Sequence, residues 1–125
     1  MRSILVIEDD ADLRLVLEQT LASAGYEVRT ASDGKEASRL YQPNSPDLVI
    51  TDIYMPNKDG LEVIMELRAS FPRIKVIAIS GQVTQKNMLP VASSLGAVRT
   101  LSKPFRPQEL LALVADVLQS APEKA

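Results

Sequence analysis

Four short, largely apolar stretches of this chain each run directly into a polar residue. The stretches cover residues 4–7, 48–51, 76–79 and 98–102. The polar residues that follow them are Glu8 with Asp9, Asp52, Ser80 and Lys103. Continuous apolar runs of this length are typical of parallel strands that are covered on both faces. Because ligands bind beyond the carboxyl ends of such strands, the polar ends predict one shared cleft.

The segments between these runs have helical periodicity, which gives a five-fold alternation of strand and helix. In the first segment Gly25 is placed to stop a helix, and residues 26–31 are expected to form another strand. The buried stripe expected for this helix consists of Leu13, Val16, Leu17, Thr20, Leu21 and Ala24.

Further helices follow at similar intervals. One is expected to open at Asp33-Gly34 and reach about Tyr41, and one follows a turn-rich loop over residues 55–60. Pro90 disrupts the next segment, so a helix there is expected to start near Met88 or Leu89. The last helix starts at Pro107, and its expected buried stripe is Leu110, Leu111, Val114, Val117 and Leu118.

Composition excludes several classes of function. The 125 residues, 46% hydrophobic and 24% charged, suit one domain, and the formal charge of −2 argues against direct binding of nucleic acid. No run is long enough to span a membrane, and the first residues do not predict a signal peptide. Without cysteine or histidine, thiolate sites and histidine-dependent nucleophiles are excluded, so any phosphohistidine would lie on another protein. We expect a cytoplasmic domain.

The acids at two strand ends need a positive partner. Like charges about 4 Å apart cost roughly 4 kcal/mol at an effective dielectric constant of about 20. A site made only of oxygen ligands selects a hard cation, and few protein ligands favour Mg²⁺ over Ca²⁺. Lys103 is the second candidate. The alternative is that the acids only cap the first helix, a role we expect for Asp10 or Asp12.

Asp52 is the candidate nucleophile, because it stands alone at the end of a strand whereas Glu8 and Asp9 form a pair suited to holding a metal ion. Ser80 either bonds a phosphoryl oxygen or only begins a turn with Gly81. Lys103 would neutralise charge during phosphoryl transfer without a general base, or else is a solvated surface lysine.

The chain resembles a receiver domain of the two-component response-regulator family over Ser3 to about Ser120. Five motifs carry the resemblance, in the family's order and spacing: residues 6–10 (Val-Ile-Glu-Asp-Asp), 51–56 with Asp59-Gly60, 79–81, 95–97, and 103–105 (Lys-Pro-Phe). The resemblance implies a three-layer, doubly wound (βα)5 flavodoxin-like α/β fold with a five-stranded parallel sheet in the order 2-1-3-4-5. Residues 1–120 would form the receiver domain, and residues 121–125 a tail or linker stub.

The resemblance also implies roles for the site residues. Asp52 accepts a phosphoryl group from a partner histidine kinase or histidine phosphotransfer protein, while Lys103 and Ser80 contact that group. Asp9, Asp52 and the Tyr54 backbone carbonyl ligate Mg²⁺, for which Mn²⁺ can substitute, and Glu8 acts through water. In the family the peptide bond before Pro104 is cis.

One departure from the family pattern concerns the output. Thr100 stands where the family usually has Tyr or Phe, so a switch that couples Ser80 to an aromatic ring is in doubt; Thr100 either rotates its hydroxyl or has no role. In the family, the positions of Tyr54 and Gln82 influence hydrolysis of the phosphoryl group. The Tyr54 ring either shields the aspartyl phosphate, which would slow its loss, or lies on the surface without effect.

The leading interpretation is a phosphorylation-dependent signalling switch. Its surface over roughly residues 88–118 would change binding partners on phosphorylation, and the downstream protein is unknown. The domain would be a monomer or a weak phosphorylation-dependent dimer, and would be no enzyme beyond its own phosphorylation and slow dephosphorylation. One alternative is a small Mg²⁺-dependent phosphohydrolase, although the acid expected two residues beyond its nucleophile is here Tyr54. The other is a constitutive, non-phosphorylated protein-binding module.

Overall fold

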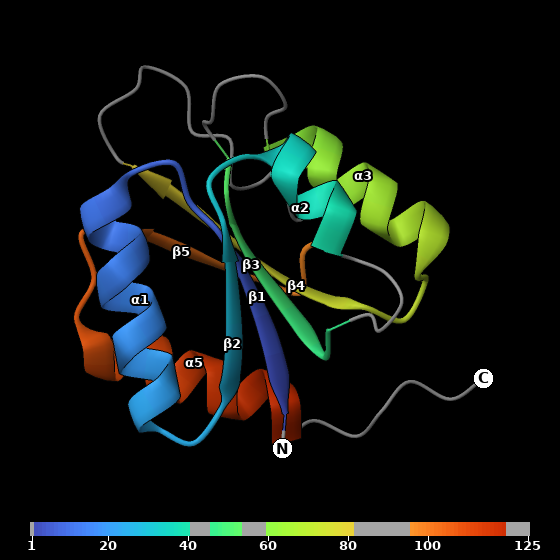
Figure 1. The fold of residues 1–125 in the computed structure, drawn as a ribbon. Helices are drawn as coiled ribbons and strands as arrows, with labels where there is room; N and C mark the ends of the chain where they lie inside the picture. Colours follow the sequence, from blue (N-terminus) through green and yellow to red (C-terminus); the bar gives the residue numbers. More distant parts are fainter. Residues whose placement is uncertain (1, 41–45, 54–59, 82–95, 120–125) are drawn as a thin grey trace.

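A computed structural model describes residues 2–40, 46–53, 60–81 and 96–119 of the chain. These residues form a five-stranded, fully parallel sheet with the strand order β2-β1-β3-β4-β5 (Figure 1). The strands are β1 (Ser3–Ile7), β2 (Glu27–Ala31), β3 (Leu48–Asp52), β4 (Lys75–Gly81) and β5 (Arg99–Lys103). The predicted fold class and strand order are confirmed.

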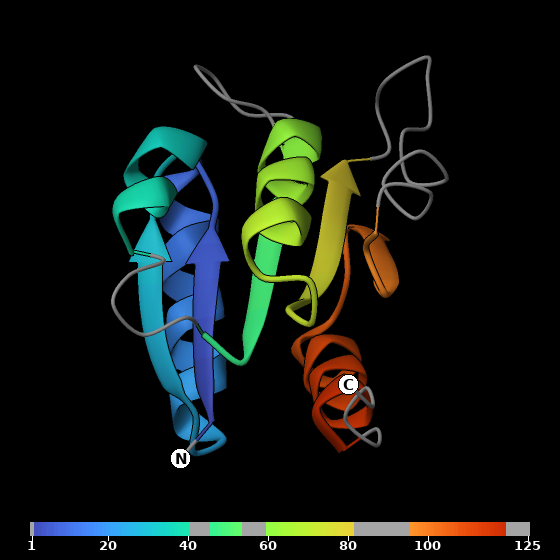
Figure 2. The ribbon, with the colours of Figure 1, turned by 90° about the vertical axis from the view of Figure 1, so that its right-hand side faces the viewer.

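Helices cover both faces of this sheet, so the domain has three layers (Figures 1 and 2). α1 and α5 lie on one face, and α2 and α3 lie on the other. The described helices are α1 (Ala11–Ser23), α2 (Gly34–Leu40), α3 (Gly60–Ser70) and α5 (Pro107–Gln119). None of them is both long and apolar enough to cross a lipid bilayer.

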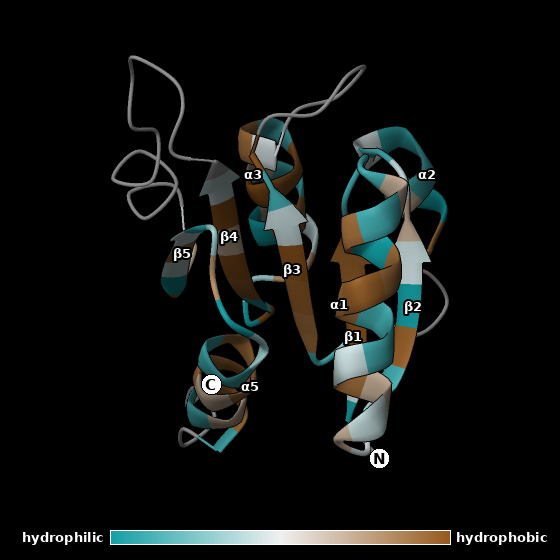
Figure 3. Cartoon of the chain, turned by 90° about the vertical axis from the view of Figure 1, so that its left-hand side faces the viewer, coloured by the Kyte–Doolittle hydropathy of each residue, from teal (hydrophilic) through white to brown (hydrophobic). Residues whose placement is uncertain are grey.

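Two apolar cores fill the spaces between the layers, because alternate residues of each strand point to opposite faces. Leu5, Val49 and Val76 pack on the side of α2 and α3. Ile4, Ile50 and Ile77 pack with residues of α1 and α5 on the other side. Brown, apolar stretches accordingly run along the central strands in Figure 3. Strands β1 and β3 are buried on both faces, as their continuous apolar sequences predict.

The helix ends follow the predicted signals. The Asp10 side chain caps α1 by accepting hydrogen bonds from the amides of Asp12 (2.9 Å) and Leu13 (3.3 Å). At the other end Gly25 has a φ of 99°, a conformation that residues with a Cβ rarely adopt. α1 therefore ends at Ser23, immediately before the predicted stop.

Three details of the predicted burial are wrong. Strand β5 is not covered on both faces; each of its residues is exposed or half-buried because it lies at the edge of the described sheet. Val16 is 50% exposed although it has the spacing of the buried stripe of α1, since only Leu17 and Leu21 of this helix are buried. Ala24 is exposed because it lies beyond the last turn as the C-cap.

Several predictions concern residues outside the described ranges. These are the loop from residue 55, the helix expected near Met88, the positions of Tyr54 and Gln82, and the tail over 121–125. The register nevertheless aligns the polar strand ends, because Ile7 pairs with Thr51, Asp52 with Ile79, and Gly81 with Lys103. The carboxyl ends of β1, β3, β4 and β5 therefore meet at one edge of the sheet.

Candidate functional site

Three carboxylates gather at the carboxyl edge of the sheet. Glu8 and Asp9 follow β1 directly, and Asp52 is the last residue of β3. One carboxylate oxygen from each lies within 4.8 Å of the others. Glu8 and Asp52 are buried, whereas Asp9 is exposed, so the cluster has a closed floor and an open side. The structure thus brings the three predicted acids together.

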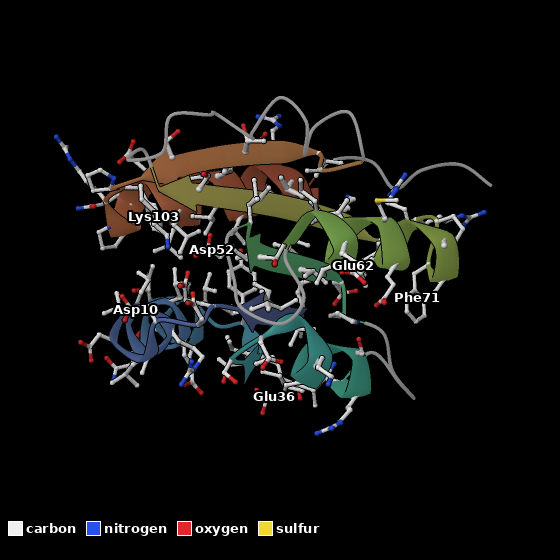
Figure 4. The ribbon with its side chains drawn as sticks, turned by 90° about the horizontal axis from the view of Figure 1, so that it is seen from above. Asp10, Glu36, Asp52, Glu62, Phe71 and Lys103 are labelled. Carbon is white, nitrogen blue, oxygen red and sulfur yellow. The ribbon has the colours of Figure 1, made fainter. Side chains whose placement is uncertain are left out.

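Lys103 reaches this cluster from the end of β5. Its Nζ donates a hydrogen bond to Oδ2 of Asp52 at 2.9 Å and lies 3.3 Å from Oε1 of Glu8. In the view from above, Lys103 and Asp52 project into the same space between the helix layers (Figure 4). The side chain of Lys103 is only 25% exposed, so its ammonium is a partly desolvated counter-charge.

Glu8 carries the least compensated charge of the site. Its Oε2 accepts a hydrogen bond from the Asp10 amide at 3.2 Å, but its buried Oε1 accepts none from the described residues, since Lys103 lies near it without suitable geometry. Burial, and next the charge of Asp52, raise the pKa of Glu8 to about 7, against smaller opposing effects of the Asp10 amide and Lys103. Glu8 is therefore partly protonated at neutral pH.

The pKa of Lys103 is raised as well, which for a lysine favours the charged form. Burial by itself lowers the pKa of Lys103, but the hydrogen bond to Asp52 and the charges of Asp52 and Glu8 outweigh it, so the net pKa is raised. The ammonium thus remains charged at neutral pH. One ammonium does not balance the three carboxylates of the cluster, even with Glu8 partly protonated, so the site keeps a negative excess.

The donor set fits a hard divalent cation. All of its ligand atoms are carboxylate oxygens, which suit Mg²⁺ or Mn²⁺, and no thiolate or imidazole is present in the sequence. The buried Oε1 of Glu8 has unused acceptor capacity next to the cluster. A cation would supply the positive charge that Lys103 alone does not provide.

The structure also describes three of the remaining predicted site residues, Ser80, Thr100 and Pro104. Ser80 is buried near the end of β4, where it pairs with Ser102, and Thr100 is half-buried in β5 opposite Ala78. Pro104 is exposed, and the Lys103–Pro104 peptide bond is cis, as the resemblance implies. Tyr54 lies outside the described residues.

Two residues that touch the acids escaped the sequence analysis. The Arg14 guanidinium, from the first turns of α1, donates a hydrogen bond to the Glu8 carbonyl oxygen at 2.9 Å. Thr51, which was grouped with an apolar run, is buried and donates its hydroxyl to the Asp52 carbonyl oxygen at 2.9 Å. A hydroxyl next to the candidate nucleophile was the only available signal for Thr51. Nothing in the pattern marked Arg14.

A groove of about 340 Å³ runs beside the site between α1 and the start of α5. Its apolar walls come from Leu13, Val16, Leu17, Phe105 and Leu110, and Asp10 and Lys103 also line it. Val16 is therefore exposed because it lines this groove. The apolar surface lies next to the cation that holds Asp52.

Comparison with known proteins places the chain in a family. The sequence model of the family described as "Response regulator receiver domain" matches residues 4–115. "Probable transcriptional regulator ycf27" of Cyanophora paradoxa is 39% identical over 120 residues, which are 94% of this chain and 48% of that protein. The alkaline phosphatase synthesis transcriptional regulatory protein PhoP of Bacillus subtilis is 32% identical, over 94% of this chain and 49% of its own length.

Solved structures agree with this assignment. The crystal structure of the receiver domain of NtrX from Brucella abortus superimposes with a TM-score of 0.88 at 30% identity, covering 94% of this chain and 99% of that one. The chain spans about half the length of the two curated relatives. The match over residues 4–115, the strand order and the shared fold together show that the chain belongs to the response regulator receiver domain family.

Proposed function

We propose that Asp52 accepts a phosphoryl group from a phosphohistidine on a partner protein, either a histidine kinase or a histidine phosphotransfer protein. One observation carries the proposal: Nζ of Lys103 holds Oδ2 of Asp52 at 2.9 Å while Glu8 and Asp9 lie in the same cluster. The candidate nucleophile thus lies between a fixed cation and a pair of acids suited to a metal ion. The sequence contains no histidine, so the donor histidine belongs to another molecule.

The proposed step forms one bond and breaks one. A carboxylate oxygen of Asp52 attacks phosphorus, and the bond between phosphorus and the imidazole nitrogen breaks as that nitrogen takes its electron pair. The other ring nitrogen of the phosphohistidine carries a proton, so the products are an aspartyl phosphate and a neutral imidazole on the partner. Because the nucleophile is already a carboxylate, no general base is needed, and catalysis consists of positioning and charge neutralisation.

Each residue of the site has a part in this step. Lys103 has three N–H donors, so it can hold Asp52 and also donate to an oxygen of the incoming group. Asp9, Asp52 and the Tyr54 carbonyl would hold Mg²⁺ or Mn²⁺ directly, and Glu8 would hold it through water. Such an ion, when bound, would neutralise charge on the carboxylates and on the phosphoryl oxygens. Ser80 would hydrogen-bond the group once it is attached.

The output is proposed to be a shift between two conformations of the surface that includes β5 and α5. Thr100 belongs to β5, and its strand partner Ala78 is two residues before Ser80 on β4. The domain would act through a downstream protein, as a monomer or a weak dimer. Relatives are named transcriptional regulators, but the net charge of −2 argues against direct binding of nucleic acid by this domain.

The setting and boundaries of the domain are also proposed. A cysteine-free sequence fits the cytoplasm. The receiver domain would comprise residues 1–120, followed by the tail over 121–125, and would act as a switch that is phosphorylated and slowly dephosphorylated rather than as an enzyme on other substrates.

The experiment is intact-mass measurement after incubation with a small-molecule phosphodonor, with and without Mg²⁺. We expect the native chain to gain one phosphoryl group only in the presence of Mg²⁺ and Asp52→Asn to gain none. Asp33→Asn, which removes a carboxylate from the neighbouring strand-to-helix turn, is the matched control and should be labelled normally. Absence of labelling in the native chain, with a positive-control receiver in the same assay, would instead favour a constitutive binding module.

A further inference from the structure

A buried hydroxyl lies next to the phosphoacceptor. Thr51 has no exposed surface, and its strand neighbours in register are the apolar residues Ile7 and Ala78. A hydroxyl in such surroundings is costly unless it is hydrogen-bonded. The Thr51 hydroxyl bonds the backbone carbonyl oxygen of the next residue, Asp52, at 2.9 Å. The bond therefore acts on the peptide unit that joins Asp52 to Ile53.

A glycine contacts the same peptide unit. The Gly60 amide, at the start of α3, donates a hydrogen bond to the Ile53 carbonyl oxygen at 2.8 Å. A Cβ added to Gly60 would lie 2.7 Å from the Ile53 Cα and 2.9 Å from the Asp52 carbonyl carbon, with the Asp52 carbonyl oxygen closer still. These distances are shorter than Cβ atoms tolerate, and the atoms they involve are backbone. Only glycine fits at residue 60 without displacing the end of β3.

We infer that Thr51 and Gly60 are positioning residues that fix the peptide unit after Asp52. This unit sets the direction of the Asp52 carboxylate, so it controls how that carboxylate meets a metal ion and a phosphoryl donor. The inference rests on the proposed function. Phosphoryl transfer is sensitive to such control, because a misplacement of about 1 Å costs a factor of roughly 100 in rate.

Two substitutions at Thr51 separate positioning from packing. Thr51→Val keeps the volume of the side chain and removes the hydroxyl, whereas Thr51→Ser keeps the hydroxyl and removes a methyl group. The measurements are the Mg²⁺ dissociation constant by calorimetry, the rate of labelling by a small-molecule phosphodonor at saturating Mg²⁺, and Tm. Thr51→Val should weaken Mg²⁺ binding about threefold and slow labelling about tenfold. Thr51→Ser should stay within about twofold of the native chain in both, despite a lower Tm.

Glycine substitutions give an independent pair. Gly60→Ala should weaken Mg²⁺ binding and slow labelling at least as much as Thr51→Val. Gly25→Ala is the matched control, because its φ of 99° makes alanine strained while an added Cβ meets nothing within 4 Å, and Gly25 precedes β2 at the opposite edge of the sheet from the site. Gly25→Ala should lower Tm and leave Mg²⁺ binding and labelling unchanged. If Gly60→Ala does not fold, the Thr51 pair alone decides.

The outcomes separate this inference from the proposed function. If the native chain is labelled and Thr51→Val matches it in both Mg²⁺ affinity and rate, positioning by Thr51 is overturned and the phosphoacceptor stands. Equal losses of Mg²⁺ affinity and labelling rate in Thr51→Val and Thr51→Ser would show that Thr51 acts through packing alone. That result would also overturn the inference. If the native chain is not labelled, the proposed function fails, and an unchanged Mg²⁺ dissociation constant in Thr51→Val would then reject the inference as well.

Discussion

Two neighbouring strand-to-helix turns use acidic residues in opposite ways. Between β2 and α2, Oε1 of Glu36 accepts hydrogen bonds from the Ser32 amide (2.6 Å) and hydroxyl (2.9 Å), and Oδ1 of Asp33 accepts one from the Glu36 amide (2.8 Å). All of these groups lie at the surface. Between β1 and α1, Asp10 caps the helix in the same manner, but Glu8 is buried with an oxygen that no donor satisfies.

The difference separates acidic turns that only cap a helix from acidic turns that contribute to a functional site. A carboxylate whose oxygens are used by nearby amides stabilises its own helix and has little capacity left. A buried carboxylate that lacks donors is unfavourable for folding unless something binds it. Glu8 comes closer to the second kind, because its buried Oε1 has no hydrogen-bond donor among the described residues, and its neighbours Asp52 and Lys103 give it a chemical context. The turn between β2 and α2 therefore provides a set of control residues.

The largest predicted contrast is in the pH dependence of stability without metal. The pKa of Glu8 is about 7 when folded and near 4.5 when unfolded, so the folded state binds the proton more tightly. The contribution of Glu8 to the free energy of unfolding is greatest below pH 4.5. As the pH rises from 4.5 to 7, this contribution falls by about 3 kcal/mol. Urea unfolding in the presence of a chelator should show this fall in the native chain and not in Glu8→Gln.

Glu36→Gln is the control for this measurement, with the opposite sign. Hydrogen bonds from the Ser32 amide, and next from its hydroxyl, lower the pKa of Glu36. Its contribution is therefore present above its unfolded pKa and is lost as pH falls through the folded value. The substitution should leave the fall between pH 4.5 and 7 intact. If Glu8→Gln retained that fall, the buried carboxylate would not be its source.

The second contrast is the response to Mg²⁺. At a free concentration ten times the dissociation constant, binding should stabilise the native chain by about 1.4 kcal/mol. Asp9→Asn should lose this gain because it removes a proposed ligand, whereas Asp33→Asn should keep it. The measurement is urea unfolding with and without the ion. An equal gain in both variants would place the bound cation away from Glu8, Asp9 and Asp52.

The smallest contrast lies within the β1-to-α1 turn itself. Asp10→Ala removes the cap of α1 and should lower the free energy of unfolding by about 1 kcal/mol. It should not change Mg²⁺ affinity, because Glu8 is bonded by the Asp10 backbone amide, which the substitution keeps. Asp33→Ala should have a similar cost at α2. A loss of Mg²⁺ binding in Asp10→Ala would mean that the cap also shapes the metal site.

Much of the fold could be predicted because burial on two faces leaves a clear record in sequence. The runs in β1 and β3 are apolar except for Thr51, and Asp10 and Gly25 bracket α1. Val16 and β5 could not be predicted in the same way. Helical spacing defines an apolar stripe but not its width, and an apolar run does not state which strand lies at the edge.

The acids and Lys103 of the site could be located because each follows a strand directly, and parallel strands end at one edge. The contacts of Arg14, Thr51 and Gly60 depend on how the turns pack and on hydrogen-bond geometry, which residue spacing does not encode. The raised pKa of Glu8 likewise depends on burial. Sequence thus identified the charged groups, and only three-dimensional packing identified the groups that hold them in place.

The hydrogen bond between Lys103 and Asp52 has a consequence for folding. Its partners are 51 residues apart in the chain and come from strands β5 and β3, with β4 between them. Contacts of such long sequence separation form late, since the intervening chain must be ordered first. A partly folded chain that lacks this bond would, under the proposed function, be a poor phosphoryl acceptor. The proposed function therefore predicts that only molecules with an assembled sheet receive the signal.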